Sequence, residues 1–189
     1  MEYDLVFLNG RVIDPESNFD GIRSVGITNG TIVCISETNL KGKLEIDISN
    51  LVLCPGFIDV HSHEHSNEYY ALKCQNGVTS VFELEVGTND VDQWYAQREN
   101  RCFVNHGVAI GHIQVRMKVF NHPPGFLPQS DSSAALQPDG IEQIKNEIEY
   151  GLKRGAMAVG FGIHYTPAAT RWEIVECFRL AKKYDVCCH

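Results

Sequence analysis

Two histidines stand two positions apart at the end of an apolar segment. Residues 55–63 read PGFIDVHSH, so His61 and His63 follow a short run of strand-forming residues. Side chains two apart on a strand point the same way, which aims both imidazoles at one place. In a parallel barrel the C-terminal strand ends carry the active site. Paired neutral imidazoles there suit a divalent transition metal, most often zinc. The alternative is a chance pair of exposed histidines, and the strand context favours the metal.

A second strand carries two acidic side chains with the same spacing. Residues 78–85 are rich in β-branched residues and end with Glu83 and Glu85, which are spaced to share one face. Two carboxylates buried on one parallel strand are costly unless a cation accompanies them. The alternative is that each pairs with an arginine or lysine of a neighbouring element.

The elements that position these residues fall into two groups. The first fifty residues predict β-structure, with two hairpins at Asn9-Gly10 and Asn29-Gly30, because Asn-Gly supplies the positive φ of a type I′ turn. From residue 54 onward, strand and helix patterns alternate. We expect strands at 78–85, 104–111, 156–163 and from 186, and helices at 64–76, 90–101, 139–154 and 170–184. Asn89 is the expected N-cap of the second helix, and the two later helices open with capping-box spacing. Residues 113–137 read as irregular.

This alternation predicts a parallel sheet, either open and doubly wound or closed into a barrel. We therefore expect an N-terminal β-segment over residues 1–53 and an α/β region over 54–189. No glycine-rich phosphate-binding motif follows any strand.

Composition and charge exclude several classes of partner. The chain has 189 residues and a formal net charge of −8, which disfavours phosphate backbones, so we expect no nucleic-acid partner. No apolar run is long enough to cross a bilayer, and no signal peptide is recognisable. Seven irregularly spaced cysteines without a CxxC pair indicate reduced thiols. We expect a cytoplasmic protein without membrane association, and the sequence leaves its oligomeric state open.

These motifs together resemble the amidohydrolase superfamily. The segment at 55–63 is similar to its first barrel strand, and residues 77–81 (GVTSV) to the strand that follows. Residues 111–116 (GHIQVR) and the segment around 155–167 resemble N-acyl-D-amino-acid deacylases. Residues 83–92 resemble, less specifically, the D-glutamate deacylase branch.

The resemblance implies a (β/α)₈ TIM barrel, a small β-domain and one or two zinc ions that activate water against an amide. D-aminoacylases place a cysteine ligand after the second strand, where this sequence has Val86, and other amidohydrolases use a carboxylated lysine that residues 159–165 lack. A carboxylate can replace either group. We expect Glu85, nearer the strand end, to be the bridging ligand, with Glu83 as the alternative.

The resemblance also assigns roles to residues further along. His189 matches a zinc-ligating histidine at the fifth strand end, although it is the last residue and the alternative is a frayed terminus. Arg116 is a candidate to bind a substrate carboxylate, and Tyr165 to donate its hydroxyl to the substrate. His112 either lines the site or satisfies a loop carbonyl. We treat His65, His106, His122 and His164 as structural or exposed.

The expected activity is hydrolysis of N-acyl-D-amino acids, with N-acyl-D-glutamate as the specific candidate. A barrel needs roughly 250 residues, so we expect the chain to be a fragment, truncated at about the fifth strand and inactive alone. The family's general-base aspartate is then expected beyond the chain. The alternatives are a cyclic amidase resembling dihydroorotase or hydantoinase, against which the missing lysine speaks, and a non-catalytic scaffold.

Overall fold

The computed structural model describes residues 2–123, 125–128 and 135–189. The chain divides into two compact units, Met1–Gly56 and Phe57–His189. The boundary expected after residue 53 lies three residues before this division. Each unit contains one sheet, and each sheet is built by its own stretch of sequence.

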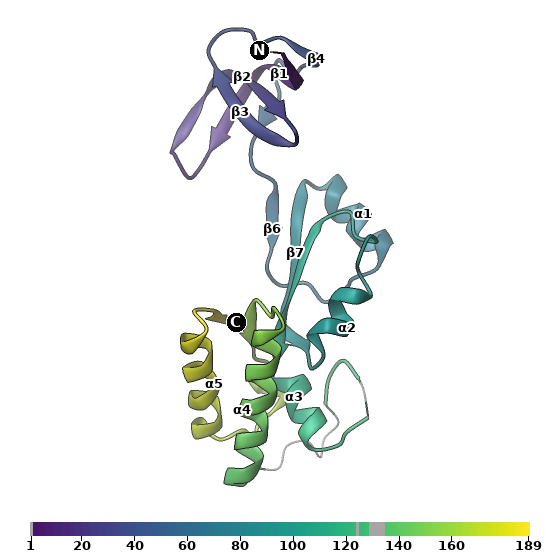
Figure 1. Ribbon diagram of the computed structural model, residues 1–189, viewed down its shortest axis with the longest axis vertical. Helices are drawn as coiled ribbons and strands as arrows, with labels where there is room; N and C mark the ends of the chain where they lie inside the picture. Colours follow the sequence, from purple (N-terminus) through teal and green to yellow (C-terminus); the bar gives the residue numbers. More distant parts are fainter. Residues whose placement is uncertain (1, 124, 129–134) are drawn as a thin grey trace. The chain divides into compact units, whose positions relative to one another are not determined.

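The first unit is a small mixed sheet (Figure 1). Its strands run in the order β3-β2-β1-β4, and β5 also pairs with β1. Strands β1 to β3 are antiparallel, whereas β4 and β5 lie parallel to β1. The bounds are β1 Tyr3–Asp14, β2 Phe19–Thr28, β3 Thr31–Ser36, β4 Gly42–Asp47 and β5 Val52–Leu53.

One of the two predicted hairpins is confirmed and the other is wrong. Asn29 and Gly30 both have positive φ and connect β2 to β3, as a type I′ turn requires. Asn9, also with positive φ, instead lies inside the continuous strand β1, at a register shift between Phe7 and Gly10. The Asn-Gly pair therefore makes a bulge there, and β1 turns towards β2 only after Asp14.

The second unit alternates strands and helices, as the sequence predicts. Its five strands are all parallel, in the order β10-β9-β8-β7-β6. The strands are β6 Phe57–Asp59, β7 Val78–Thr88, β8 Asn105–Gly111, β9 Ala158–Gly160 and β10 Cys187–Cys188. The helices are α1 Asn67–Gln75, α2 Val91–Ala96, α3 His112–Val119, α4 Pro138–Lys153 and α5 Arg171–Lys183, with a 3₁₀ turn, η2, at Ile163–Tyr165.

The helix starts differ from the prediction in four places, the first of which is α1, which begins at Asn67 rather than at Glu64. Helix α3 begins directly at the end of β8, in a region expected to be irregular. Asp90 rather than Asn89 caps α2, and Gln137 occupies the N-cap of α4 without a side-chain hydrogen bond. Thr170 does cap α5, by accepting from the Glu173 N–H. In the part of the chain that the structure describes, no helix combines the length and apolar character needed to cross a membrane.

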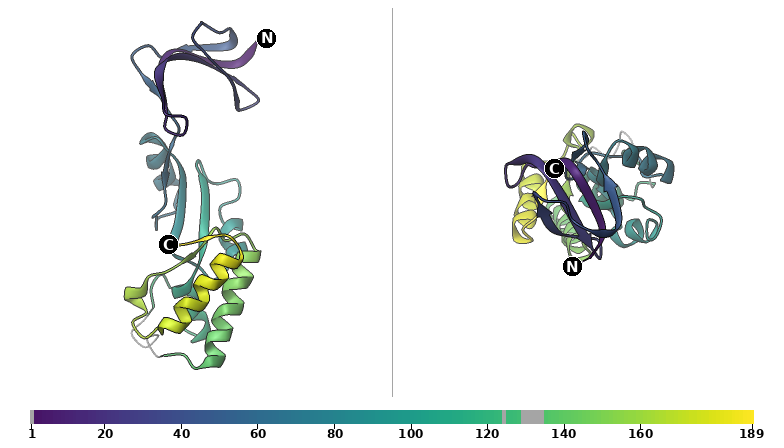
Figure 2. Two further views of the ribbon diagram at one scale, coloured as in Figure 1. Left: turned by 90° about the vertical axis from the view of Figure 1, so that its left-hand side faces the viewer. Right: turned by 90° about the horizontal axis from the view of Figure 1, so that it is seen from above.

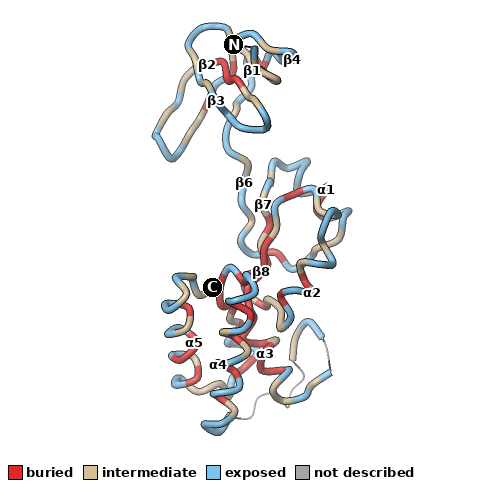
Figure 3. Tube along the Cα trace, in the orientation of Figure 1, coloured by how far each residue is buried: buried red, intermediate tan, exposed pale blue. Residues whose placement is uncertain are grey.

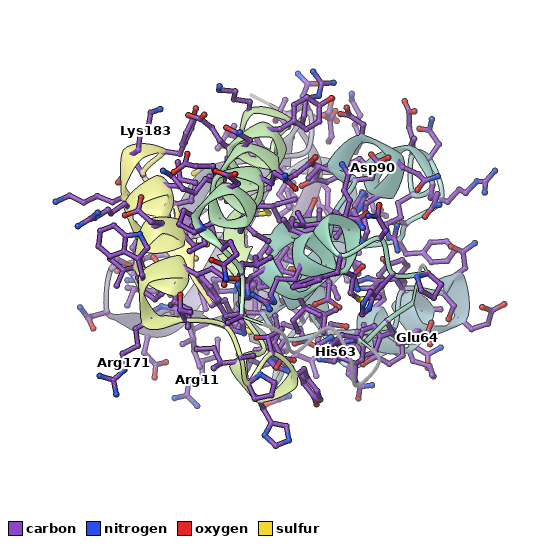
Figure 4. All side chains as sticks on the ribbon, turned by 90° about the horizontal axis from the view of Figure 1, so that it is seen from below. Arg11, His63, Glu64, Asp90, Arg171 and Lys183 are labelled. Carbon is purple, nitrogen blue, oxygen red and sulfur yellow. The ribbon has the colours of Figure 1, made fainter. Side chains whose placement is uncertain are left out.

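The core of this unit lies between the sheet and its helices. Val108 and Ile110 of β8 pack with Ile144 and Ile148 of α4 and Cys177 of α5. Helices α4 and α5 lie side by side in both views of Figure 2, and Arg171 and Lys183 mark the ends of α5 in Figure 4. Figure 3 shows buried positions along β7 and β8 and on these helices.

A second, smaller apolar cluster lies on the opposite face of the sheet. Ala109 of β8 and Ala158 of β9 alternate with the residues that face the helices, and they contact Leu84 of β7.

Candidate metal centre

The segment after β6 places His61 and His63 on one side of the chain. The Asp59 carboxylate accepts from the His61 N–H at 3.1 Å and also pairs with Lys73 of α1. Burial opposes the charge on Asp59, but the bonds from Lys73 and the His61 N–H outweigh it and lower the pKa of the carboxyl. The Ser62 N–H donates to the Phe82 carbonyl at 3.1 Å. Two hydrogen bonds thus fix the start of the loop, one to the Asp59 side chain and one to the backbone of β7.

Three donor atoms, two from the segment after β6 and one from β7, come together here. His63 Nε2 lies 3.1 Å from His61 Nε2 and 3.2 Å from Glu85 Oε2, and His61 Nε2 lies 3.4 Å from that same oxygen. Two ligands each 2.0–2.1 Å from a tetrahedral zinc stand about 3.3 Å apart. The three atoms therefore have the mutual spacing of ligands around one metal ion, and they form the metal-compatible group found among the described residues.

Glu83 lies behind His63 and outside this group of three. Its Oε2 is 2.8 Å from His63 Nδ1, on the opposite side of the ring from Glu85. Its side chain is only 5% exposed, against 24% for Glu85. Burial opposes its charge, but hydrogen bonds involving His65, His63 and the Gly87 N–H outweigh it and lower the pKa of Glu83. Glu83 and Glu85, the two candidates for the bridging ligand, thus occupy different positions: Glu85 lies with the two histidine donors and Glu83 lies behind His63.

Among residues 2–123, 125–128 and 135–189, neither glutamate forms an ion pair with lysine or arginine. Each contacts imidazoles instead. The alternative interpretation, in which both carboxylates pair with basic side chains of neighbouring elements, therefore has no support in the described structure.

His189 lies beside His61 but on its other nitrogen. The backbone of His189 continues the pairing with β9, through the Val159 carbonyl and the Phe161 N–H. Its Nε2 is 3.2 Å from His61 Nδ1, whereas His61 turns Nε2 towards His63 and Glu85. His189 is consequently adjacent to the three donors without sharing their common point, and its role as a ligand stays a prediction.

The two predicted substrate ligands lie in different surroundings. Arg116 of α3 is fully buried and contacts both oxygens of Glu173 at 2.5 and 2.7 Å. Binding a substrate carboxylate would require its guanidinium to leave this pair. Tyr165 is 40% exposed in η2. Gly162 links it to the site, since a Cβ there would lie 2.9 Å from the Tyr165 ring and 3.5 Å from Glu85 Oε1.

Two of the remaining histidines, His112 and His65, have clear hydrogen-bond partners. His112 is fully buried and pairs with Glu173 at 2.8 Å, so it satisfies a carboxylate rather than a loop carbonyl. His65 contacts the Tyr70 hydroxyl and the Ser62 carbonyl at 2.8 and 3.0 Å. In Figure 4 His63 is labelled beside Glu64, which belongs to the same loop. Glu173, the partner of both His112 and Arg116, was not among the predicted site residues, because helical spacing alone does not show which helix faces α3.

Among the curated relatives, a D-aminoacylase matches almost the whole chain. The D-aminoacylase of Alcaligenes xylosoxydans xylosoxydans is 27% identical over 214 residues, which covers 94% of this chain and 42% of that protein. The dihydroorotase of Aquifex aeolicus is 43% identical, but over 60 residues, 31% of this chain and 14% of that protein. The chain thus spans less than half the length of these relatives. No protein-family model matches it.

Solved structures show the same fold. The N-acyl-D-glutamate deacylase of Bordetella bronchiseptica, described in complex with zinc and a phosphonate inhibitor, superposes with a TM-score of 0.83 at 20% identity, covering all of this chain and 44% of that one. A D-aminoacylase variant in complex with copper chloride gives 0.81 at 22% identity, covering 98% and 44%. The predicted fold class, part of a TIM barrel preceded in the chain by a separate small sheet, is confirmed. In sequence and in fold, the chain therefore resembles the D-aminoacylases and N-acyl-D-glutamate deacylases of the amidohydrolase superfamily.

Proposed function

We propose that these residues form the metal-binding part of an amidohydrolase that cleaves the amide of N-acyl-D-amino acids. The observation that carries the proposal is the convergence of His61 Nε2, His63 Nε2 and Glu85 Oε2 at neighbouring strand ends. Similarity to D-aminoacylase over 94% of the chain gives that convergence its chemical context. N-acyl-D-glutamate is the specific substrate that we propose, because a deacylase of that substrate has the same fold.

In this proposal His61, His63 and Glu85 hold the metal, and His189, which lies beside His61, is a further candidate ligand. A divalent cation bound there supplies Lewis-acid polarisation of an amide carbonyl and a water that is acidic near neutral pH. Zinc fits the two imidazoles and one carboxylate, a donor set that catalytic zinc sites use. Glu85 takes the place that a cysteine or a carboxylated lysine has in the family pattern.

Two groups on this chain are proposed to meet the substrate. Tyr165, partly exposed and near Glu85 through Gly162, can donate its hydroxyl to the amide oxygen or to the acyl group. Arg116 is proposed to bind the substrate carboxylate only if the Glu173 pair opens. We assign no general base among the described residues.

The first prediction concerns metal binding. We expect the purified protein to bind zinc stoichiometrically, and His61→Ala with His63→Ala to abolish that binding, because two of the three converging donors are removed. Metal analysis after equilibrium dialysis measures it. His164→Ala, which removes an exposed imidazole outside the group, is the matched control and should leave the zinc content unchanged. Full zinc occupancy in a folded double variant would refute the site.

A cyclic amidase is the second candidate function, since 60 residues of the chain are 43% identical to a dihydroorotase. Hydrolysis assays on the zinc-loaded protein with N-acetyl-D-glutamate, N-acetyl-L-glutamate and dihydroorotate separate the candidates. Turnover of the D-amide alone supports the deacylase, and turnover of dihydroorotate alone would replace it. A folded protein that binds no zinc and turns over none of these substrates would favour a non-catalytic scaffold.

A further inference from the structure

Glu83 is a buried carboxylate that faces one imidazole nitrogen and two backbone N–H groups. Its Oε2 lies 2.8 Å from His63 Nδ1, and its Oε1 accepts from the Val86 and Gly87 N–H groups at 3.1 and 3.2 Å. His65 Nε2 lies farther away, at 3.9 Å. With 5% of its side chain exposed, this carboxylate is held almost entirely by protein donors.

The backbone of β7 is shaped to deliver two of those donors. Its pairing with β8 is irregular between Glu83 and Thr88, and Gly87 has a φ of +63°. A Cβ on Gly87 would lie 2.5 Å from the Ala109 carbonyl oxygen. A left-handed, close-packed glycine thus turns the amides back onto the Glu83 carboxylate, which fixes the carboxylate in turn.

An ionised carboxylate can only accept hydrogen bonds, so the contact with Glu83 requires His63 to carry its proton on Nδ1. That leaves the lone pair on His63 Nε2, the atom 3.1 Å from His61 Nε2 and 3.2 Å from Glu85 Oε2. We infer that Glu83 is a positioning residue, which sets the tautomer and ring orientation of His63 so that Nε2 is free to bind the metal. This rests on the proposed function, and outer carboxylates act in this way on ligating histidines in other metal sites.

Glutamine has nearly the same shape but cannot serve the three donors. If its carbonyl oxygen keeps the Val86 and Gly87 N–H groups, its NH₂ faces His63 Nδ1. His63 Nδ1 must then accept, and the ring proton moves to Nε2, where it blocks the lone pair. If the amide is reversed, its NH₂ faces the Val86 and Gly87 N–H groups, so donors face donors and these two backbone groups lose their acceptor.

The experiment compares Glu83→Gln with the wild-type protein in two measurements. Zinc affinity, from competition with a chromophoric chelator, should fall about 10–100-fold, the usual cost of losing such a carboxylate. Nitrogen-15 NMR of the metal-free protein, at a pH where imidazole is neutral, should show His63 protonated on Nδ1 in the wild type and on Nε2 in the variant. The control is Glu64→Gln. Glu64 is an exposed glutamate in the loop that carries His63, and its carboxylate accepts from the Ser66 N–H, so this substitution should change neither measurement.

The two measurements separate this inference from the proposed function. If the wild type binds no zinc, the metal centre fails, while the tautomer of His63 still tests the role of Glu83. Wild-type affinity and an unchanged tautomer in Glu83→Gln would overturn the positioning role. If the variant does not fold, the wild-type spectrum alone decides, because a proton on His63 Nε2 there would contradict the inference.

Discussion

Single residues decide stability most sharply where charges are buried, and Arg116 and Glu173 are the clearest case. Both side chains have no exposed surface, and they join α3 to α5. His112 adds a third contact to the same carboxylate. Burying charges is tolerated only when geometry and hydrogen bonds compensate for lost hydration; here one Arg116 nitrogen, Nη1, contacts both carboxylate oxygens of Glu173.

We expect Glu173→Gln to lower the free energy of unfolding by about 3 kcal/mol, because a buried guanidinium loses the charge that matches it. Urea denaturation measures the change. The control is Glu147→Gln, which breaks the partly exposed pair with Lys118 and should cost less than about 1 kcal/mol. Equal effects of the two substitutions would show that the buried pair does not stabilise the fold.

The pH dependence of the same variant is a further check. Burial opposes the charge of Glu173, but bonds from His112 and Arg116 outweigh it, so the pKa of Glu173 lies below its ordinary value in the folded protein. The stabilisation is therefore complete above the ordinary value and lost as the pH falls through the lowered one. Wild-type stability should fall more steeply with acid than that of Glu173→Gln.

The site residues divide into those that strand periodicity predicts and those that it does not. The convergence of His61, His63 and Glu85 follows from spacing of two and from the common edge of parallel strands. The separate place of Glu83 does not, because it depends on the irregular end of β7 and on the positive φ of Gly87. Periodicity describes a regular strand and says nothing of where a bulge turns the amides.

At the scale of elements, the same dipeptide gives two different structures. Asn29-Gly30 makes a hairpin, whereas Asn9-Gly10 makes a bulge in β1. Gly10 leaves no room for a side chain, since a Cβ there would lie 2.2 Å from the Ile48 side chain. Tertiary packing of β1 against the next segments thus selects the bulge, and the local sequence carries no signal for that choice.

Helix α3 is an element that the local sequence did not predict. Its residues lie in a stretch that reads as irregular because prolines follow it, and its N-cap is Gly111, which makes no side-chain cap bond. His112, Ile113, Val115, Arg116 and Met117 are nevertheless buried. Packing on both sides stabilises this helix, whereas α5, with its Thr170 cap and amphipathic pattern, was predictable.

Gly87 is a position in β7 where we expect a side chain to be poorly tolerated. Gly87→Ala would place a methyl group 2.5 Å from the Ala109 carbonyl oxygen and 2.8 Å from the Gly111 nitrogen, at a φ that L-residues disfavour. We expect a loss of about 3 kcal/mol in denaturation, as for a site where strain and overpacking add, together with weaker zinc binding because the Glu83 amides move.

Gly77→Ala is the matched control. Gly77 also has a positive φ, at +78°, but a Cβ there would make only ordinary contacts with the Phe57 ring at 3.5 Å. It should cost about 1 kcal/mol, the conformational part alone, and leave zinc affinity unchanged. A similar loss from both substitutions would mean that the packing around Gly87 is looser than described.

At the scale of the whole molecule, the distribution of exposed apolar side chains is uneven. Strand β6 is an edge of the parallel sheet, and its Phe57 and Ile58 are 64% and 61% exposed. The small sheet exposes Ile22, Ile32 and Leu44 to between 55% and 60%. Parallel strands are normally covered on both faces, and an exposed apolar edge invites pairing with another chain.

We therefore expect the 189-residue chain, studied alone, to self-associate through β6 and to bind the dye ANS, which reports exposed apolar surface. Sedimentation velocity should show species larger than the monomer, and Phe57→Lys with Ile58→Lys should reduce them, because charged side chains on an edge oppose pairing. Phe103→Lys is the control: Phe103 is 67% exposed but lies outside every strand, so its replacement should leave the association unchanged. A monodisperse monomer that melts cooperatively without binding ANS would show that the exposed edge is tolerated in solution. If Phe103→Lys reduced the association as much as Phe57→Lys with Ile58→Lys does, the association would result from general apolar exposure rather than from β6.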